Sequence, residues 1–314
     1  MTPYLLIRNI QIQNANAMSS PVTIGFPAMT AWLGGVHALE RRLRAREGLS
    51  DISFTGAAVS CHAFDLQTYC GKGAYEDSIL LFAKPLTGTN KQKNPLLNTK
   101  TGGEPASPND VKTPSFIEEA RIHLNVSLLL RLGHMTADIR ERLIEAVREE
   151  LPCLKLAGGD ILRFTLPESI FYVDETAEDG ELKVLSKLMP GYVLVERRDL
   201  MEKAMAEGKN GVEALLHYLE IQYQPEKKKD AEGLRWVGKK AEPGWIVPIA
   251  VGFKGLSPLG KVACQRDAET PHRFAESVIT LGEFKMPYHF QHISEILWKY
   301  EYLADKNLYL CRNK

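Results

Sequence analysis

The sequence predicts an α+β protein, and two patterns carry that prediction. Between residues 121 and 132, apolar side chains alternate with mostly polar ones, which is the period-two pattern of a strand with one buried face. After Pro27 the apolar side chains recur at helical spacing, at Leu33, Val36, Leu39 and Leu43. Together with the segments around them, these elements give the order strand, helix, two strands, helix, strand, which is the ferredoxin-like arrangement.

Short-range signals in the sequence predict the first two strands of this order and the helix between them. Residues 4–12 are rich in long and β-branched apolar side chains, as are residues 51–64, and we expect a strand in each. A helix over residues 28–47 lies between them. Proline and glycine exclude a helix just before it, in "SSPVTIGFP", and Gly48 is well placed to end it.

The second half follows the alternating strand. Thr136 is a suitable N-cap for a helix that Pro152 ends. The stretch "LAGGDIL" then predicts a double-glycine turn at Gly158 and Gly159 that leads into the last strand. The buried side of the helix is formed by Ile139, Leu143, Ile144 and Val147.

The connection between the second and third strands, residues 67–115, is far longer than a hairpin loop. Its core, residues 84–112, is rich in lysine, proline and glycine, which indicates either a functional basic projection or a loop kept soluble by its charge. We therefore expect residues 1–66 and 116–175 to form the ferredoxin-like domain, residues 67–115 a thumb-like basic insertion, and residues 176–314 an additional C-terminal α/β region.

The C-terminal region shows weaker patterns. We expect a helix over residues 212–223, a solvated linker in "PEKKKDAEG", a strand within "PGWIVPIAVGFKGLSP", and a late helix over residues 293–302.

Composition narrows the classes of function. The formal net charge is zero, so a surface for nucleic acid must be local. Five scattered cysteines without a CxxC pair indicate neither a zinc knuckle nor a disulfide framework, and we expect no cofactor and no metal. The segment "GLRWVGKK" matches GxxxxGK, but Lys240 stands where a P-loop needs Ser or Thr. With no secretory pattern and no membrane-spanning run, we expect a cytoplasmic protein that does not bind a membrane.

One flank of the first helix is basic, since His37, Arg41 and Arg44 recur at i, i+4 and i+7. This flank either contacts RNA or only complements the negative end of the helix dipole. His37 is also the one candidate for acid–base catalysis, because a histidine beside arginines can move a proton in metal-free RNA cleavage. Without a sequence-adjacent acid or base, a structural or RNA-contacting role for His37 is the preferred interpretation.

Several longer stretches resemble a known family. In this order, "IQNANAMSSPVTIGFPAMTAWLGGVHALERRL", "EEARIHLNVSLLL", "LAGGDIL", "PGWIVPI", "LSPL", "RDAETPHRFAE" and "LGEF" are similar to the second Csy subunit of the type I-F CRISPR surveillance complex. The resemblance runs from Ile12 to Phe284. It implies a repeat-associated mysterious protein (RAMP) fold, with a thumb, that holds the five-prime handle of the CRISPR RNA together with the large subunit.

The resemblance also implies a role without catalysis. In that family guide cleavage belongs to another subunit, the thumb meets RNA or a backbone subunit, and target DNA is reached through the complex. The alternative is a metal-independent RAMP endoribonuclease that processes repeat RNA with His37 as general acid or base. The residues expected to contact RNA are Asn14, Asn16, Ser19, Ser20, His37, Arg41, Lys91, Lys93, Arg121, His123, Gly158, Gly159, Arg266 and Arg273.

Overall fold

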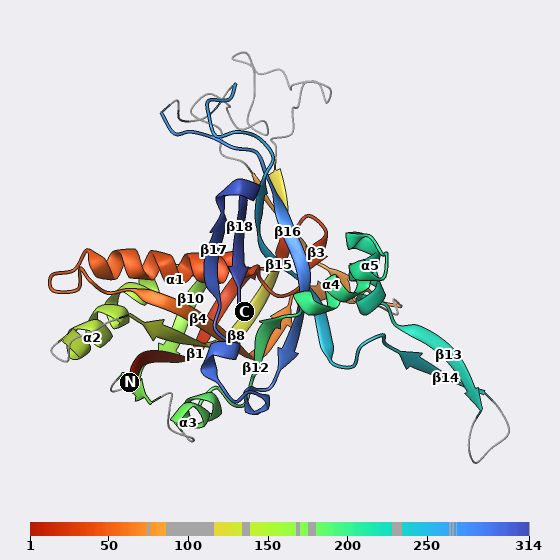
Figure 1. Cartoon of the computed structure of the whole chain (residues 1–314), viewed down its shortest axis with the longest axis horizontal. Helices are drawn as coiled ribbons and strands as arrows, with labels where there is room; N and C mark the ends of the chain where they lie inside the picture. The colour runs from red at the N-terminus through yellow and green to blue at the C-terminus, as the bar shows by residue number, and fades with distance from the viewer. Residues whose placement is uncertain are drawn as a thin grey trace, which may run out of the picture.

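The computed structural model describes residues 1–73, 76–85, 116–133, 139–167, 170–174, 180–227, 234–263, 265, 267 and 269–313. The predicted N-cap Thr136 and the centre of the basic insertion, residues 86–115, lie outside these ranges. Mixed helices and mostly antiparallel strands make the fold α+β, as the sequence predicts (Figure 1).

The first sheet is formed by four strands in the order β4–β8–β1–β10, with every neighbouring pair antiparallel. Helix α1 (Met29–Arg44) follows β1 along the chain and α2 (Arg140–Glu150) follows β8. Both predicted helices are therefore confirmed, and a 3-10 turn containing Pro152 ends α2. The strands are β1 (Thr2–Asn16), β4 (Phe54–Leu66), β8 (Phe116–Leu132) and β10 (Gly159–Thr165), and short strands β9 (Lys155–Leu156) and β11 (Phe171–Val173) extend the edge.

The C-terminal region continues this sheet. Strand β12 pairs with β4, and the order then runs β16, β15, β18, β17, so one sheet of twelve described strands crosses the molecule. The predicted strand within "PGWIVPIAVGFKGLSP" is confirmed as β15. The bounds are β12 (Tyr192–Glu196), β15 (Trp245–Gly255), β16 (Ala275–Lys285), β17 (Lys299–Leu303) and β18 (Leu308–Arg312).

Both faces of the first sheet are covered. Helices α1 and α2 bury one face through side chains such as Trp32 and Leu143. The opposite face, expected to be largely polar and open, is covered by α3 (Gly180–Ser186) and by the 3-10 turns at Pro287–His289 and Ile293–Glu295. Leu129 and Ser127 on that face of β8 are fully buried. The expectation of an open face is wrong along this part of β8, because segments from the C-terminal region pack on it (Figure 1).

Two further predictions in the C-terminal region need correction. The helix expected to reach residue 223 is α5 (Gly211–Leu219), which follows α4 (Arg198–Ala206) and ends before β13 (Gln222–Lys227). The expected linker is therefore partly strand, because β13 pairs with β14 (Leu234–Lys239) in a hairpin that extends from the body (Figure 1).

The prediction of a late helix over residues 293–302 is also wrong. Those residues form a 3-10 turn and then β17. Trp298 explains the difference, because its backbone pairs with Ala57 of β4 and its indole Nε1 donates to the Leu194 carbonyl at 2.8 Å. Bonds to two other strands replace the bonds that a helix would need at this position.

Small strands lie at the ends of the main sheet. Strands β2 (Met18–Ser20) and β3 (Thr23–Ile24) pair just after β1, and β5 (Thr68–Tyr69) pairs with β6 (Ser78–Ile79) after β4. Strand β7 (Leu81–Pro85) pairs with the start of β8, so the described parts of the insertion leave the sheet as a hairpin.

We predict opposite effects on stability for two Gly→Ala variants. A Cβ at Gly159 would lie 2.7 Å from the backbone atoms Ala15 N and Gln13 O, whereas nothing lies within 4 Å of one at Gly34 on α1. Gly159→Ala should lower the free energy of unfolding by about 1–3 kcal/mol, and Gly34→Ala should raise it by about 0.5–1 kcal/mol. Urea titration of both purified variants measures this, and equal effects would contradict the close packing of the turn.

Candidate nucleic-acid interface

The end of β1 is bulged and held from three sides. Asn14 has φ 57° in a break of the pairing with β8, a conformation that asparagine tolerates better than most residues. Its backbone N–H donates to His123 Nδ1 at 3.1 Å, and its carbonyl accepts from Arg121 Nη1 at 3.0 Å. The side-chain amide of Gln67 donates to Asn14 Oδ1 at 2.8 Å. The bulge therefore presents an exposed asparagine on a fixed backbone.

The loop after the bulge is shaped by hydroxyl contacts. The Thr23 hydroxyl lies 2.8 Å from that of Ser19 and 2.7 Å from that of Ser20, which ties β3 to β2. Asn16 Oδ1 accepts from the Met18 N–H at 2.9 Å. Proline and glycine prevent a helix here, and these bonds replace the helical ones, so the apolar loop before α1 keeps a defined form.

The double-glycine turn packs against the same place. Ala157 and Gly158 have φ 50° and 80°, and the Ala157 carbonyl accepts from the Asn16 N–H at 2.9 Å. Gly159 has no room for a side chain beside β1. The structure thus brings together eight residues that the sequence predicted for RNA contact: Asn14, Asn16, Ser19, Ser20, Arg121, His123, Gly158 and Gly159. We call them the β1-end cluster.

The members of the β1-end cluster differ in exposure. Asn14 is exposed, while Asn16, Ser19 and His123 are half-buried. Ser20 and Arg121 are buried, and the Arg121 guanidinium pairs with Glu119 as well as with the Asn14 carbonyl. Arg121 thus holds the bulge in place and has little surface to offer a ligand.

His37 and Arg41 are both exposed on α1. Within the described part of the chain, neither side chain has a hydrogen-bond or ion-pair partner. Arg44, on the same flank, is instead occupied by Glu40 at 3.0 Å and by the Ile52 carbonyl at 2.6 Å. The flank therefore offers two unpaired groups, and no described carboxylate accompanies His37.

The remaining predicted contacts lie elsewhere. Arg273 precedes β16, where its Nη1 donates to Asn307 Oδ1 at 3.1 Å and its side chain packs over Gly255. Lys91, Lys93 and Arg266 lie outside the described residues. Sequence reasoning missed Gln67 and Thr23, whose side chains fix the bulge and the loop. Gln67 carries no local signal, because it meets Asn14 of β1 only through the pairing of both β4 and β1 with β8.

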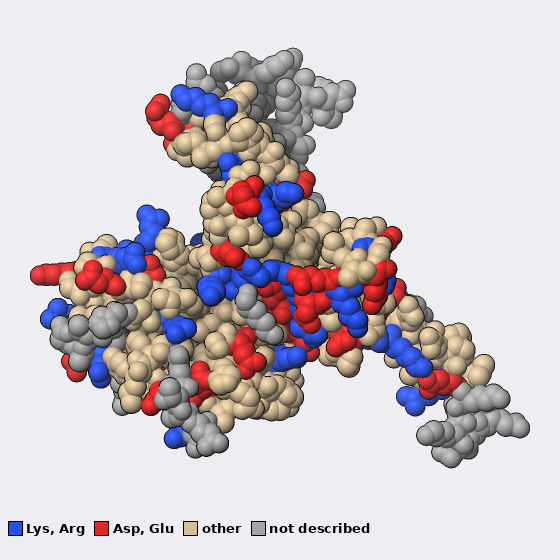
Figure 2. All heavy atoms as spheres, viewed as in Figure 1, with Lys and Arg blue, Asp and Glu red and all other residues tan. Residues whose placement is uncertain are grey.

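The described surface has no uniform sign of charge. Figure 2 shows acidic side chains gathered over α4 and α5, where Asp199, Glu202, Glu207, Glu213 and Glu220 are exposed. In the described ranges, no three His, Cys, Asp or Glu side chains gather closely enough to hold a metal ion. None of the described helices combines the length and the apolar character needed to span a membrane.

Comparison with known proteins identifies the family of this chain. The family model described as "CRISPR-associated protein (Cas_Csy2)" matches residues 5–311. The chain belongs to the Csy2 family. It is 33% identical to CRISPR-associated protein Csy2 of Pseudomonas aeruginosa (strain UCBPP-PA14) over 331 aligned residues, which cover 97% of this chain and 93% of the relative. The resemblance to a type I-F Csy2 subunit is thereby confirmed, and this Csy2 protein is a CRISPR-associated subunit of a defence complex.

We predict that Arg121 stabilises the fold. Arg121→Ala removes the buried cation that pairs with Glu119 and the donor to Asn14, and should lower the free energy of unfolding by about 3 kcal/mol. The control Arg163→Ala, at an exposed position on β10, should change it by less than about 0.5 kcal/mol. Chemical denaturation compares the two. If Arg121→Ala is as stable as the control, the residue is free to act on a ligand instead.

Proposed function

We propose that this Csy2 protein is a non-catalytic scaffold that holds the five-prime handle of the CRISPR RNA together with the large subunit. The observation that carries this is the β1-end cluster, in which a bulge, a shaped loop and a double-glycine turn meet at one place. Exposed backbone and small polar side chains of this kind are suited to single-stranded RNA, whose bases and sugars are accessible.

The fold supports the same proposal. The order β4–β8–β1–β10, with helices after β1 and β8, is the strand order of a ferredoxin-like RAMP domain. We assign residues 1–66 and 116–175 to this domain, residues 67–115 to a thumb that meets RNA or a backbone subunit, and residues 176–314 to the C-terminal region. The protein then contacts target DNA only through the assembled complex.

Arg41 of α1 supplies local positive charge on a chain whose formal net charge is zero. It lies beside His37 on an exposed helix flank, and no described carboxylate pairs with either side chain. An unpaired arginine can neutralise a phosphate without first breaking an ion pair. We therefore assign the phosphate contacts of the handle to this flank and to the insertion.

We predict a salt-dependent affinity for handle RNA. If about five phosphates are neutralised, log K should fall with log salt at a slope of about −3.5, or roughly a hundredfold from 50 to 200 mM salt. Arg41→Ala should reduce the slope by about 0.7, because one phosphate contact is lost. Lys203→Ala on α4 is the control and should leave the slope unchanged. A flat salt response of the wild type, measured by fluorescence anisotropy, would indicate that the subunit touches only protein.

One substitution distinguishes the scaffold from the second candidate function, a metal-independent endoribonuclease that uses His37. His37→Ala should leave cleavage of repeat RNA unchanged, because the scaffold does no chemistry and His37 has no described acid or base beside it. Incubating labelled repeat RNA with the wild type and the variant measures this. Cleavage by the wild type that the variant loses would make the protein an enzyme.

A further inference from the structure

Two adjoining cavities lie where β4 meets the C-terminal region. The larger has a volume of about 800 Å³ and the smaller about 400 Å³. Three aromatic residues, Tyr192 of β12, Trp245 of β15 and Phe284 of β16, line both cavities and so form their shared wall. We call the pair the junction groove.

Aromatic rings with solvent-exposed surface dominate the groove. Trp245 is 41% exposed, with ring centroids 4.9 Å from Phe284 and 5.3 Å from Tyr192. Phe64, at the end of β4, is 56% exposed and closes the outer side of the smaller cavity. So much exposed aromatic surface in one concave place marks a site of interaction.

The smaller cavity suits an apolar occupant. Its histidine, His62, already uses both ring nitrogens, on the Pro190 carbonyl and on Ser127 Oγ at 2.7 Å. The Cys61 thiol contacts the Ala63 carbonyl, and burial raises its pKa to about 12, so it stays neutral. A nucleobase seated in this cavity would leave much of its polar edge without partners, which costs free energy. An aliphatic or aromatic side chain carries no such cost.

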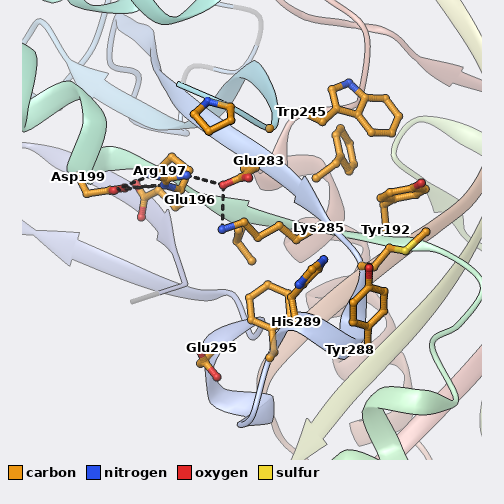
Figure 3. Close-up of a pocket in the computed structure, with 16 residues that line it drawn as sticks. Tyr192, Glu196, Arg197, Asp199, Trp245, Glu283, Lys285, Tyr288, His289 and Glu295 are labelled. Atoms are coloured by element: carbon orange, nitrogen blue, oxygen red, sulfur yellow. Dashed lines mark hydrogen bonds and ion pairs between the residues drawn. The ribbon is translucent and has the colours of Figure 1, made fainter. Parts of the chain in front are cut away.

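The larger cavity suits a cation. Four acidic residues line it, Glu196, Asp199, Glu283 and Glu295, against two cationic ones, Arg197 and Lys285. Glu196 pairs with Arg198, which does not itself line the cavity. Figure 3 shows that both cations are joined to Glu283, Lys285 at 3.0 Å, and that Arg197 also pairs with Asp199. Both cations and three of the carboxylates are therefore engaged in ion pairs within the wall, whereas Glu295 has no cationic partner among the described residues. With Arg198 counted, four carboxylates face three cations, so the remaining negative charge would repel a phosphate and attract an ammonium or guanidinium group.

Aromatic groups reinforce this preference. The rings of Tyr288 and His289 lie in contact in a tilted arrangement, with a centroid distance of 4.2 Å, on the side of the larger cavity across from Asp199 and Arg197 (Figure 3). Tyr288 is 60% exposed. A cation that enters between the carboxylates and these rings gains cation–π as well as ionic contacts.

We propose that the junction groove docks a segment of a partner protein in which a large apolar side chain lies beside a lysine or arginine. The apolar side chain enters the smaller cavity and the cation enters the larger one. The partner is a protein subunit of the same complex, so the inference rests on the proposed scaffold role. The RNA handle stays at the β1-end cluster, and the groove gives the protein a second, separate contact.

The test uses the assembled complex with its guide RNA. A photoreactive benzoylphenylalanine in place of Phe64 should crosslink to a protein subunit, within a peptide that has a large apolar residue next to Lys or Arg. In parallel, Phe64→Ser should weaken binding to that isolated subunit at least tenfold. Phe253→Ser is the matched control, because Phe253 is 44% exposed on β15 and lines neither cavity. Its binding should not change.

Two results would overturn the inference. Crosslinks from position 64 to RNA alone would make the groove a nucleotide site, and equal binding by Phe64→Ser, Phe253→Ser and the wild type would show that no subunit occupies it. Melting temperatures of the free variants verify that each is folded. Guide-RNA binding by the same samples distinguishes this failure from failure of the scaffold proposal, since loss of the groove contact leaves RNA binding by the free chain intact.

Discussion

A short joint between β4 and β12 continues the first sheet into the C-terminal region. Only two residue pairs form its ladder, Tyr192 with Cys61 and Val193 with Ser60. Side-chain hydrogen bonds reinforce it, because the buried Ser60 Oγ donates to the Leu188 carbonyl at 3.0 Å and the half-buried His62 bridges the Pro190 carbonyl and Ser127. The joint also requires a glycine at 191, where a Cβ would collide with the side chains of Ser60 and His62.

Trp298 makes a second connection next to this joint. It is fully buried, exchanges backbone hydrogen bonds with Ala57 at 2.9 and 2.8 Å, and donates its indole N–H to Leu194. The two contacts place the turns after β16 on the far face of the first sheet. As a result, the junction groove and the covered face of β8 both lie at the joint, whereas the β1-end cluster, with its exposed Asn14, lies outside the packed region.

Local patterns in the sequence were sufficient to predict the main strands and helices from β1 to β10. Apolar spacing predicted α1 and β8, and Gly158 and Gly159 predicted the turn before β10, because periodicity and turn chemistry are local properties. The packing of segments that lie far apart in the chain could not be predicted from these local patterns. The residues that cover Leu129 include Val184 and Ile296, which lie far from it in the sequence. The spacing of Ile293, Ile296 and Leu297 equally fits a helix and the observed turn, and the bonds of Trp298 to other strands decide between them.

For the candidate site, too, the sequence predicted the separate motifs but not the contacts between them. The "NANAMSSP" loop and the glycine turn were found as separate motifs, and the structure places them in contact through Asn16 and Ala157. The role of Arg121 was missed. Alternation places Glu119 and Arg121 on the same face of β8, but it gives no sign that Arg121 is buried or that it reaches the Asn14 carbonyl of β1. We propose that the small and polar residues of the cluster, together with the unpaired Arg41 of α1, form a local surface for RNA on a chain with zero net charge.

The scaffold account is tested most directly by the RNA that the protein retains in cells. The chain is expressed with a CRISPR array, with and without the other subunits and the separate nuclease, and bound RNA is sequenced to map its ends. The account predicts one intact guide with a defined five-prime handle, recovered only when the nuclease is present. Handle ends generated by this protein alone would contradict it and would make the protein a ribonuclease.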